Sequence, residues 1–190
     1  MYSQQDVTGL ILAGGAGRRV SGRDKGLIEW HGKALVTHVI QRLQGQVGQL
    51  LISCNRNADI YSAFGLQLVS DQREDFQGPL AGIESAAILV NTRFLVVVPC
   101  DTPALPGDLV DRLLAPLQDS SGHSADISFV HDGEREQYLC AALHSKVLAS
   151  LSAYLDSGQR AVRHWYAQHR VTAVDFSDQQ RAFENQNYID

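Results

Sequence analysis

Four short aliphatic runs in the first half of the chain alternate with stretches whose apolar residues recur at helical spacing. The runs cover residues 10–13, 50–52, 66–69 and 94–98, and helices are expected at 34–43, 58–64 and 78–90. Strands that alternate with helices predict a mainly parallel sheet that is covered on both faces. We therefore expect an α/β fold, a three-layer αβα sandwich around a Rossmann-like sheet.

The second half of the chain continues the pattern. Further helices are expected at 108–117, 145–156 and 160–169, and further strands at 127–130, 138–143 and 171–175. A length of 190 residues fits one domain, because domains hold roughly 150 residues on average. The polar stretch at 119–124 is too short to separate two domains, so a single domain is expected to cover residues 1–190.

Composition argues against several classes of function. The chain carries 16 Lys and Arg against 21 Asp and Glu, a formal charge of −5, and nucleic-acid binding is not expected because it requires many basic phosphate contacts. The longest apolar run, near 94–100, is far shorter than the roughly 20 residues of a membrane span. The three cysteines, Cys54, Cys100 and Cys140, are widely spaced, which favours reduced thiols. We expect a cytoplasmic monomer without a membrane segment.

Polar residues follow each of the first four predicted strands. They lie in residues 14–25 and 53–56 and at Asp71 and Asp101. Ligands of parallel α/β sheets bind at the carboxyl ends of the strands. These four segments should therefore meet at one edge of the sheet and form a site there.

The segment after the first strand combines glycines with cations. Gly14 and Gly15 open a turn whose backbone amides can approach an anion. Four cations follow within eight positions: Arg18, Arg19, Arg23 and Lys25. Val20 breaks the dinucleotide-binding fingerprint, and Gly22 is not followed by the Lys and Ser or Thr of a P-loop. The pattern favours a phosphate-binding loop of another type, and the alternative is a solvated basic turn.

The two carboxylates at the strand ends each allow two interpretations. Asp101, between Pro99 and Pro103, either ligates Mg²⁺, which takes one or two protein carboxylates plus substrate phosphates, or caps the next segment. Asp71 either binds a nucleotide hydroxyl or caps a turn. Cys100 is expected to be a buried small apolar side chain, and no nucleophile with an assignable base is recognisable in the sequence.

The order of these motifs resembles a known family along nearly the whole chain. The matching blocks are residues 12–15, Arg18-Arg19, 22–27, Asn55-Arg56, Ser70-Asp71, 78–82, 99–103, 131–135, 174–178, Asn185 and Asn187. The chain resembles the molybdenum cofactor guanylyltransferases, whose fold is similar to that of the nucleotide-diphospho-sugar transferases. That family transfers GMP from GTP to the terminal phosphate of molybdopterin and releases pyrophosphate.

The resemblance implies roles for individual residues. GTP would be bound by Leu12, Ala13, Gly14, Gly15, Lys25, Ser53, Asp71 and Asp101. Arg19, Lys25 and Asp101 would be catalytic, Asp101 would hold the cofactor Mg²⁺, and Gly82, Asn185 and Asn187 would face the pterin. Ser53 stands where the family often has asparagine, and residues 137–139 and 187–189 lack prolines usual in the family. Proteins that insert molybdenum or chaperone molybdoenzymes are the implied protein partners.

The expected mechanism needs no protein nucleophile. Glycine amides, Arg19 and Lys25 would bind the triphosphate while the ionised phosphate of molybdopterin attacks in line. One rival is a nucleotidyltransferase of another specificity, such as a cytidylyl or sugar-1-phosphate enzyme, which thermal shift with GTP and CTP would separate. The other is a non-catalytic GTP-binding module, which would release no pyrophosphate.

Overall fold

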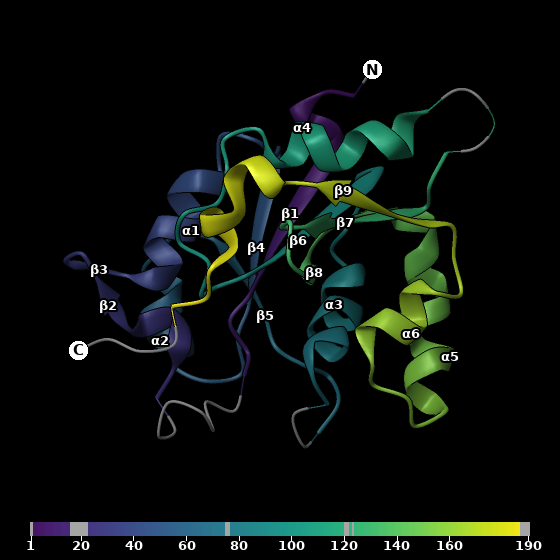
Figure 1. The fold of residues 1–190 in the computed structure, drawn as a ribbon. Coiled ribbons are helices and arrows are strands. Elements are labelled where there is room, and N and C mark those ends of the chain that lie inside the picture. Colours follow the sequence, from purple (N-terminus) through teal and green to yellow (C-terminus); the bar gives the residue numbers. More distant parts are fainter. Residues whose placement is uncertain (1, 16–22, 75–76, 120–121, 123, 187–190) are drawn as a thin grey trace.

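A seven-stranded sheet forms the centre of the molecule in the computed structural model, which describes residues 2–15, 23–74, 77–119, 122 and 124–186 (Figure 1). Its strands are β1 (Val7–Leu12), β4 (Gln49–Ser53), β5 (Gln67–Val69), β6 (Phe94–Pro99), β7 (Ile127–His131), β8 (Glu136–His144) and β9 (Val171–Asp175). The order across the sheet is β5-β4-β1-β6-β8-β7-β9. β8 is antiparallel to both neighbours, and the other neighbouring pairs are parallel. The expectation of a mainly parallel sheet is confirmed.

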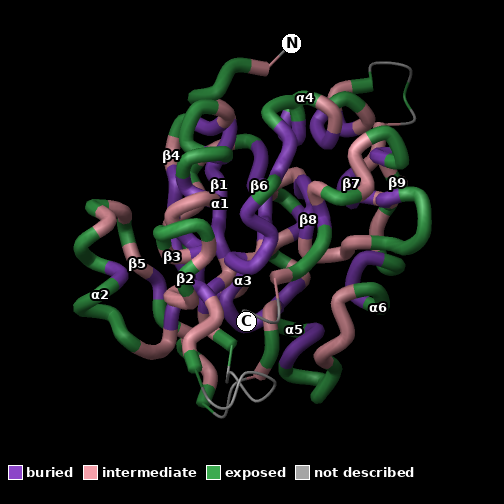
Figure 2. The backbone as a smooth tube through the Cα atoms, turned by 60° about the vertical axis from the view of Figure 1, so that its left-hand side comes forward, coloured by how far each residue is buried: buried purple, intermediate pink, exposed green. Residues whose placement is uncertain are grey.

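The residues of the central strands are largely buried (Figure 2), and they belong to two cores on opposite faces of the sheet. In β6, Val96 and Val98 belong to the core on one face, and Leu95 and Val97 to the core on the other. Successive side chains of a strand point to opposite faces, so a strand covered on both sides needs a continuous aliphatic run. This requirement explains why the strands could be located from uninterrupted apolar runs.

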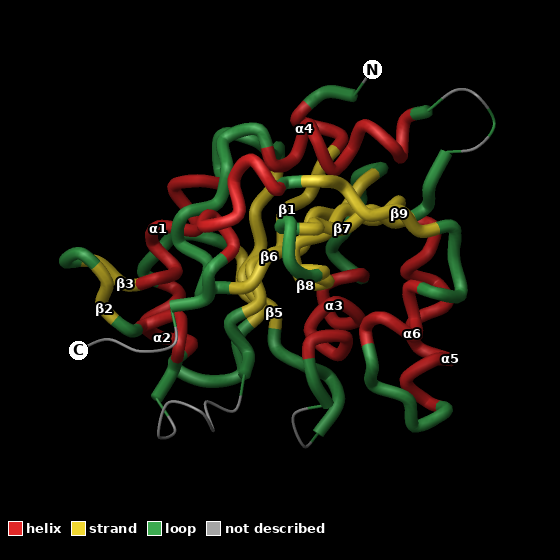
Figure 3. The backbone as a smooth tube through the Cα atoms, viewed as in Figure 1, coloured by secondary structure: helices red, strands yellow, loops and turns green. Residues whose placement is uncertain are grey.

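Helices form the outer two layers (Figure 3). The core on one face includes residues of α1 (Leu35–Leu43), α2 (Ala58–Ser62) and α4 (Leu109–Leu114). The core on the other face includes residues of α3 (Pro79–Ala87), α5 (Leu151–Asp156) and α6 (Val162–Tyr166). The expected three-layer αβα arrangement is therefore confirmed. Among the described residues, no helix has both the length and the apolar character required to cross a bilayer.

Several predicted helices are shorter than expected. The helix expected at 108–117 ends at Leu114 and continues as the 3₁₀ helix η4 (Ala115–Gln118); Pro116 has no N–H to extend the α-helical hydrogen bonding. The helix expected at 145–156 divides into the 3₁₀ helix η5 (Ser145–Ser150) and α5. The helix expected at 160–169 is α-helical only as α6.

Some short elements were not predicted from the sequence. They are the 3₁₀ helices η1 (Gln4–Asp6), η3 (Lys25–Leu27) and η6 (Ser177–Phe183) and the hairpin of β2 (Glu29–Trp30) and β3 (Lys33–Ala34). His31 and Gly32 form the hairpin turn with φ of 48° and 77°, the left-handed conformations that two-residue hairpin turns require. Two-residue strands are too short to show an alternating pattern.

Sheet topology brings five segments to one edge. β1, β4, β5 and β6 are mutually parallel, so their carboxyl ends lie together. β8 runs in the opposite direction, so its first residues reach that same edge. The segment after β9 crosses back over the α1 side of the sheet (Figure 1), and Gln186 donates its backbone N–H to the carbonyl oxygen of Asp101 at 2.9 Å.

Candidate active site

A cavity of about 750 Å³ lies at this edge of the sheet. Its wall contains every predicted site residue that the structure describes: Leu12, Ala13, Gly14, Gly15, Lys25, Ser53, Asp71, Gly82, Asp101 and Asn185. Arg19 and Asn187 lie outside the described residues, as do Val20 and Ser21. The polar residues that follow the strands do meet at one site, and the function of each residue stays a prediction.

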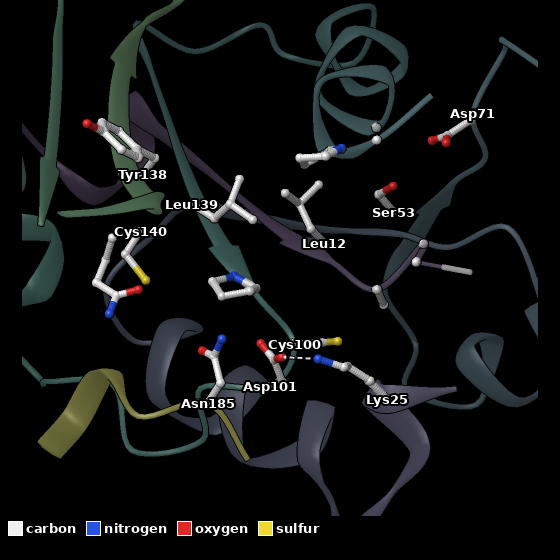
Figure 4. A pocket seen from close by; sticks show the side chains of 18 residues that line it. Leu12, Lys25, Ser53, Asp71, Cys100, Asp101, Tyr138, Leu139, Cys140 and Asn185 are labelled. Carbon is white, nitrogen blue, oxygen red and sulfur yellow. Dashed lines mark hydrogen bonds and ion pairs between the residues drawn. The ribbon is translucent and has the colours of Figure 1, made fainter. Parts of the chain in front are cut away.

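Lys25 and Asp101 form an ion pair in the cavity wall. Lys25 Nζ lies 3.0 Å from Asp101 Oδ2, and the exposed fractions of the two side chains are 24% and 8%. Figure 4 shows the pair below the centre of the cavity. Lys25 begins η3 and Asp101 follows β6. A cation and a carboxylate from distant parts of the chain are therefore adjacent in the cavity wall. Such a pair offers partners to a phosphate and to a divalent cation at once.

Asp71 is held by Asn55 across two strand ends. Asn55 Nδ2 donates to Asp71 Oδ2 at 2.8 Å, and the Asp71 backbone N–H donates to Asn55 Oδ1 at 2.8 Å. Within the described part of the chain, Asp71 Oδ1 is buried and has no hydrogen-bond partner. Burial raises the pKa of Asp71 above its usual value. A buried acceptor without a donor is costly, so this oxygen is available to a donor from a ligand.

The Asn55 side chain binds other groups of the protein and does not line the cavity. Its amide also donates to the carbonyl oxygen of Gly14 at 3.2 Å, which ties the end of β1 to the ends of β4 and β5. Ser53 lines the cavity and Asn55 does not. Ser53 thus faces the cavity, while the Asn55 side chain is bound to Gly14 and Asp71.

Gly82 allows α3 to approach the sheet closely. A Cβ atom on Gly82 would lie 2.6 Å from Ser53 Oγ and 3.2 Å from Leu12 Cδ2, so a larger side chain would displace both groups. The helix begins after Gly78, whose φ of 87° favours glycine, with Pro79 in its first turn. Gly78, Pro79 and Gly82 all line the cavity.

One wall of the cavity was not assigned to the site from the residues. It is formed by Gln137, Tyr138, Leu139 and Cys140 at the start of β8, and Figure 4 labels the last three of these residues. The strand-end rule applies to the carboxyl ends of parallel strands, whereas the antiparallel β8 brings its amino end to this edge. The apolar pattern of β8 does not indicate whether the strand is parallel or antiparallel to its neighbours. Only the missing proline near 137–139 pointed to this segment.

Cys100 also lines the cavity but is not suited to act as a nucleophile. It is 5% exposed, which confirms the expected buried side chain. Burial and the negative charge of Asp101 raise the pKa of the Cys100 thiol. The thiol therefore stays protonated at neutral pH, and the thiolate is the reactive form of cysteine.

Solved structures with this fold include nucleotidyltransferases. One is molybdopterin-guanine dinucleotide biosynthesis protein A from Archaeoglobus fulgidus, with a TM-score of 0.76 and 19% identity over 95% of this chain and 92% of that one. Another is 4-diphosphocytidyl-2C-methyl-D-erythritol synthase from Anaerococcus prevotii, with a TM-score of 0.69 and 10% identity over 90% and 87% of the two chains. At these identities the likeness establishes the fold alone.

Sequence comparison narrows the class. A family model for the MobA-like NTP transferase domain matches residues 9–173, and with the fold and the cavity it defines a nucleotidyltransferase. The molybdenum cofactor guanylyltransferase of Shewanella halifaxensis is 44% identical over 181 residues, which cover 95% of this chain and 89% of that protein. The chain belongs to the molybdenum cofactor guanylyltransferase family.

Proposed function

We propose that this protein transfers GMP from GTP to the terminal phosphate of molybdopterin, which forms the guanine dinucleotide cofactor and releases pyrophosphate. The observation that carries the proposal is the ion pair of Lys25 and Asp101 in the wall of a large cavity, in a chain of this family. A cytoplasmic monomer with one domain over residues 1–190 remains part of the proposal.

The nucleotide would occupy the part of the cavity between β1, β4 and β5. There Gly14 offers close backbone approach, Ser53 offers a hydroxyl, and Asp71 offers the buried oxygen that has no protein donor. Leu12, Ala13 and Gly15 complete this wall. A guanine nucleotide carries amino, imino and ribose hydroxyl donors that match the Asp71 acceptor.

The pterin would occupy the opposite part. The start of β8 supplies Tyr138, Leu139 and Cys140, and Asn185 lies at the same side as Asp101 (Figure 4). Gly82 keeps α3 close to the sheet without filling the cavity. An aromatic and aliphatic wall with the side-chain amides of Gln137 and Asn185 suits a flat heterocycle with polar edges.

Asp101 is the residue that would hold Mg²⁺. The described residues contain no cluster of three or more His, Cys, Asp or Glu side chains able to bind a metal ion. The carboxylate of Asp101 in the cavity wall nevertheless fits Mg²⁺, which takes one or two protein carboxylates together with substrate phosphates. The bound ion would neutralise negative charge on the triphosphate.

Lys25 would stabilise charge that develops during transfer. An oxygen of the acceptor phosphate forms a bond to the α-phosphorus of GTP, and the bond from that phosphorus to the bridging oxygen breaks. The electron pair leaves with pyrophosphate. The acceptor is already ionised at neutral pH, so positioning and electrostatic stabilisation are sufficient. The ammonium of Lys25 is placed in the cavity wall to do this, and Arg19 would add a second cation.

Pyrophosphate release tests the proposal. The purified protein is incubated with Mg²⁺, molybdopterin and either GTP or CTP, and each substrate is omitted in turn. The expected result is release that needs molybdopterin and prefers GTP. Preference for CTP would indicate a cytidylyltransferase, and GTP binding without any release would indicate a binding module. Either of these results would overturn the proposal.

A further inference from the structure

The residue before Lys25, Asp24, holds the turn that carries Lys25. Lys25 starts the three-residue helix η3, and Asp24 caps that helix by accepting the Gly26 backbone N–H on Oδ1 at 3.2 Å. A helix this short has few internal hydrogen bonds. The position of the Lys25 ammonium therefore depends on what fixes Asp24.

Two side chains of the α2 region fix Asp24. The Tyr61 hydroxyl donates to Asp24 Oδ1 at 2.7 Å, and Asn57 Nδ2 donates to Asp24 Oδ2 at 3.0 Å. Tyr61 is fully buried, and burial together with the Asp24 hydrogen bond raises its pKa, so its hydroxyl stays protonated and donates. Each carboxylate oxygen of Asp24 thus accepts a hydrogen bond from a side chain of the α2 region.

The turn also rests directly on Tyr61. A Cβ atom on Gly26 would collide with the Tyr61 hydroxyl, and it would lie 3.4 Å from both Cβ and Sγ of Cys100. Cys100 precedes Asp101 in the chain. Gly26 therefore lets the Lys25 turn pack at once against α2 and against the end of β6, where the partner of Lys25 lies.

The connection between β4 and α2 also contacts both described ends of the glycine-rich segment. Arg56 Nη2 donates to the carbonyl oxygens of Gly15 at 3.2 Å and Arg23 at 3.4 Å. Asn57 follows with φ of 54°, a left-handed conformation that asparagine adopts more readily than most residues other than glycine. In this conformation the Asn57 side chain reaches Asp24.

We propose that Tyr61 and Asn57 are positioning residues that hold Lys25 in place for the reaction by binding Asp24. The inference rests on the proposed guanylyl transfer. Neither residue lines the cavity, so they act through Lys25 and not on the substrate. Their removal should lower the rate only when Lys25 is present.

A double-mutant cycle tests this dependence. Tyr61→Phe removes the hydroxyl and keeps the ring, and it is made in the wild-type and in the Lys25→Ala background. In the wild type, kcat should fall about tenfold, the scale of one lost hydrogen bond to a charged group. The KM for GTP should change by less than about twofold, because the other nucleotide contacts persist. In Lys25→Ala, the same change should alter kcat by less than about twofold.

Asn57→Gly is the second variant. Glycine keeps the left-handed backbone conformation and removes only the amide, so its effect on kcat should follow that of Tyr61→Phe and should also depend on Lys25. An equal loss of kcat in both backgrounds, or wild-type kcat in Tyr61→Phe, would overturn the inference.

Tyr154→Phe is the matched control. Tyr154 is buried, and its hydroxyl donates to the carbonyl oxygen of Ala161 at 2.8 Å on the other face of the sheet. Tyr154→Phe should lose about as much stability as Tyr61→Phe and should keep the kcat of the wild type. Hydrogen exchange of the backbone amides of residues 24–27 reports on the contact between Tyr61 and Asp24 independently of catalysis. Exchange should be faster in Tyr61→Phe and unchanged in Tyr154→Phe.

The exchange measurement separates the two proposals. If the wild type releases no pyrophosphate but Tyr61→Phe still speeds exchange at 24–27, guanylyl transfer fails and the hold on the Lys25 turn stands. If the wild type is active and exchange is unchanged in Tyr61→Phe, the positioning inference fails alone.

Discussion

Lys25 Nζ and Asp101 Oδ2 lie 3.0 Å apart although 76 positions of sequence separate the two residues. The pair joins the turn after the first strand to the end of β6, and it places a cation beside a carboxylate in the cavity wall. A bound triphosphate would attract the Lys25 ammonium and Mg²⁺ would attract the Asp101 carboxylate, so both ligands would compete with the ion pair itself.

Lys25→Ala should lower kcat/KM for guanylyl transfer by roughly 30- to 1000-fold. Removal of a charged group that stabilises the transition state in a desolvated site costs about 2–4 kcal/mol. Steady-state pyrophosphate release measures the change. Lys33→Ala, on the exposed β2–β3 hairpin, is the control and should keep wild-type kinetics. Near-wild-type turnover in Lys25→Ala would remove Lys25 from the phosphate site.

Asp101→Asn should raise the Mg²⁺ concentration needed for half-maximal activity by about tenfold or more. Loss of an outer-sphere partner alone costs roughly 10- to 100-fold in metal affinity, and loss of a ligand's charge should cost no less. Titration of activity with Mg²⁺ measures the shift. The control is Asp108→Asn, because Asp108 is half-exposed beside Arg112. An unchanged Mg²⁺ titration would show that Asp101 is not the metal ligand.

Asp71→Asn should stabilise the ligand-free protein at pH 7 while weakening GTP binding. Burial raises the pKa of Asp71 in the folded state, so the folded protein holds this proton more tightly than the unfolded chain. The stability that this carboxyl contributes is full at low pH and is lost as pH rises. The advantage of the variant should therefore vanish near pH 4, the usual range for Asp.

Thermal melts across pH and calorimetric titration with GTP measure the two effects of Asp71→Asn. Asn55 can still donate to the new amide oxygen, so the fold should persist. Lower stability at pH 7 together with unchanged GTP affinity would contradict the assigned role of the unpartnered Asp71 oxygen.

Asp126→Asn should lower stability without affecting the cavity. Asp126 is 8% exposed, and it binds Arg170 at 3.1 Å and Lys146 at 2.7 Å. These contacts lower the pKa of Asp126, with the Arg170 hydrogen bonds as the largest cause. Both partners are about half-exposed, so solvent screening reduces the loss to about 1–2 kcal/mol at neutral pH.

The pH dependence of that loss has a definite sign. A carboxyl with a lowered folded-state pKa contributes stability above its unfolded value and loses it as pH falls. The gap between wild type and Asp126→Asn should be full at pH 7 and narrow below about pH 4. Urea unfolding at both pH values measures it, and a gap that widens on acidification would contradict the assignment.

The parallel strands and the residues at their carboxyl ends could be predicted because both follow from local sequence. Uninterrupted aliphatic runs mark strands buried on both faces, and Gly14, Lys25, Asp71 and Asp101 follow such runs. The strand-end rule then required them to meet. The rule does not say which side chains pair, so the contact of Lys25 with Asp101 emerged only from the structure.

The β8 wall and the support of Lys25 could not be predicted for physical reasons. Whether a strand is parallel or antiparallel depends on its neighbours, and nothing local in residues 136–144 fixes it. Tyr61 shows the spacing of an ordinary core residue of a helix. Its hydroxyl contact with Asp24 depends on the packing of α2 under a turn 37 positions away, which no periodicity encodes.

Transfer of label from GTP tests the account most directly. The protein, Mg²⁺ and molybdopterin are incubated with GTP labelled at the α-phosphate, and in parallel with GTP labelled at the γ-phosphate. The account predicts that α-label enters a pterin dinucleotide and that γ-label leaves in pyrophosphate, with both signals strongly reduced in Lys25→Ala. Label in free GMP alone, or γ-label in the pterin product, would contradict guanylyl transfer in this cavity.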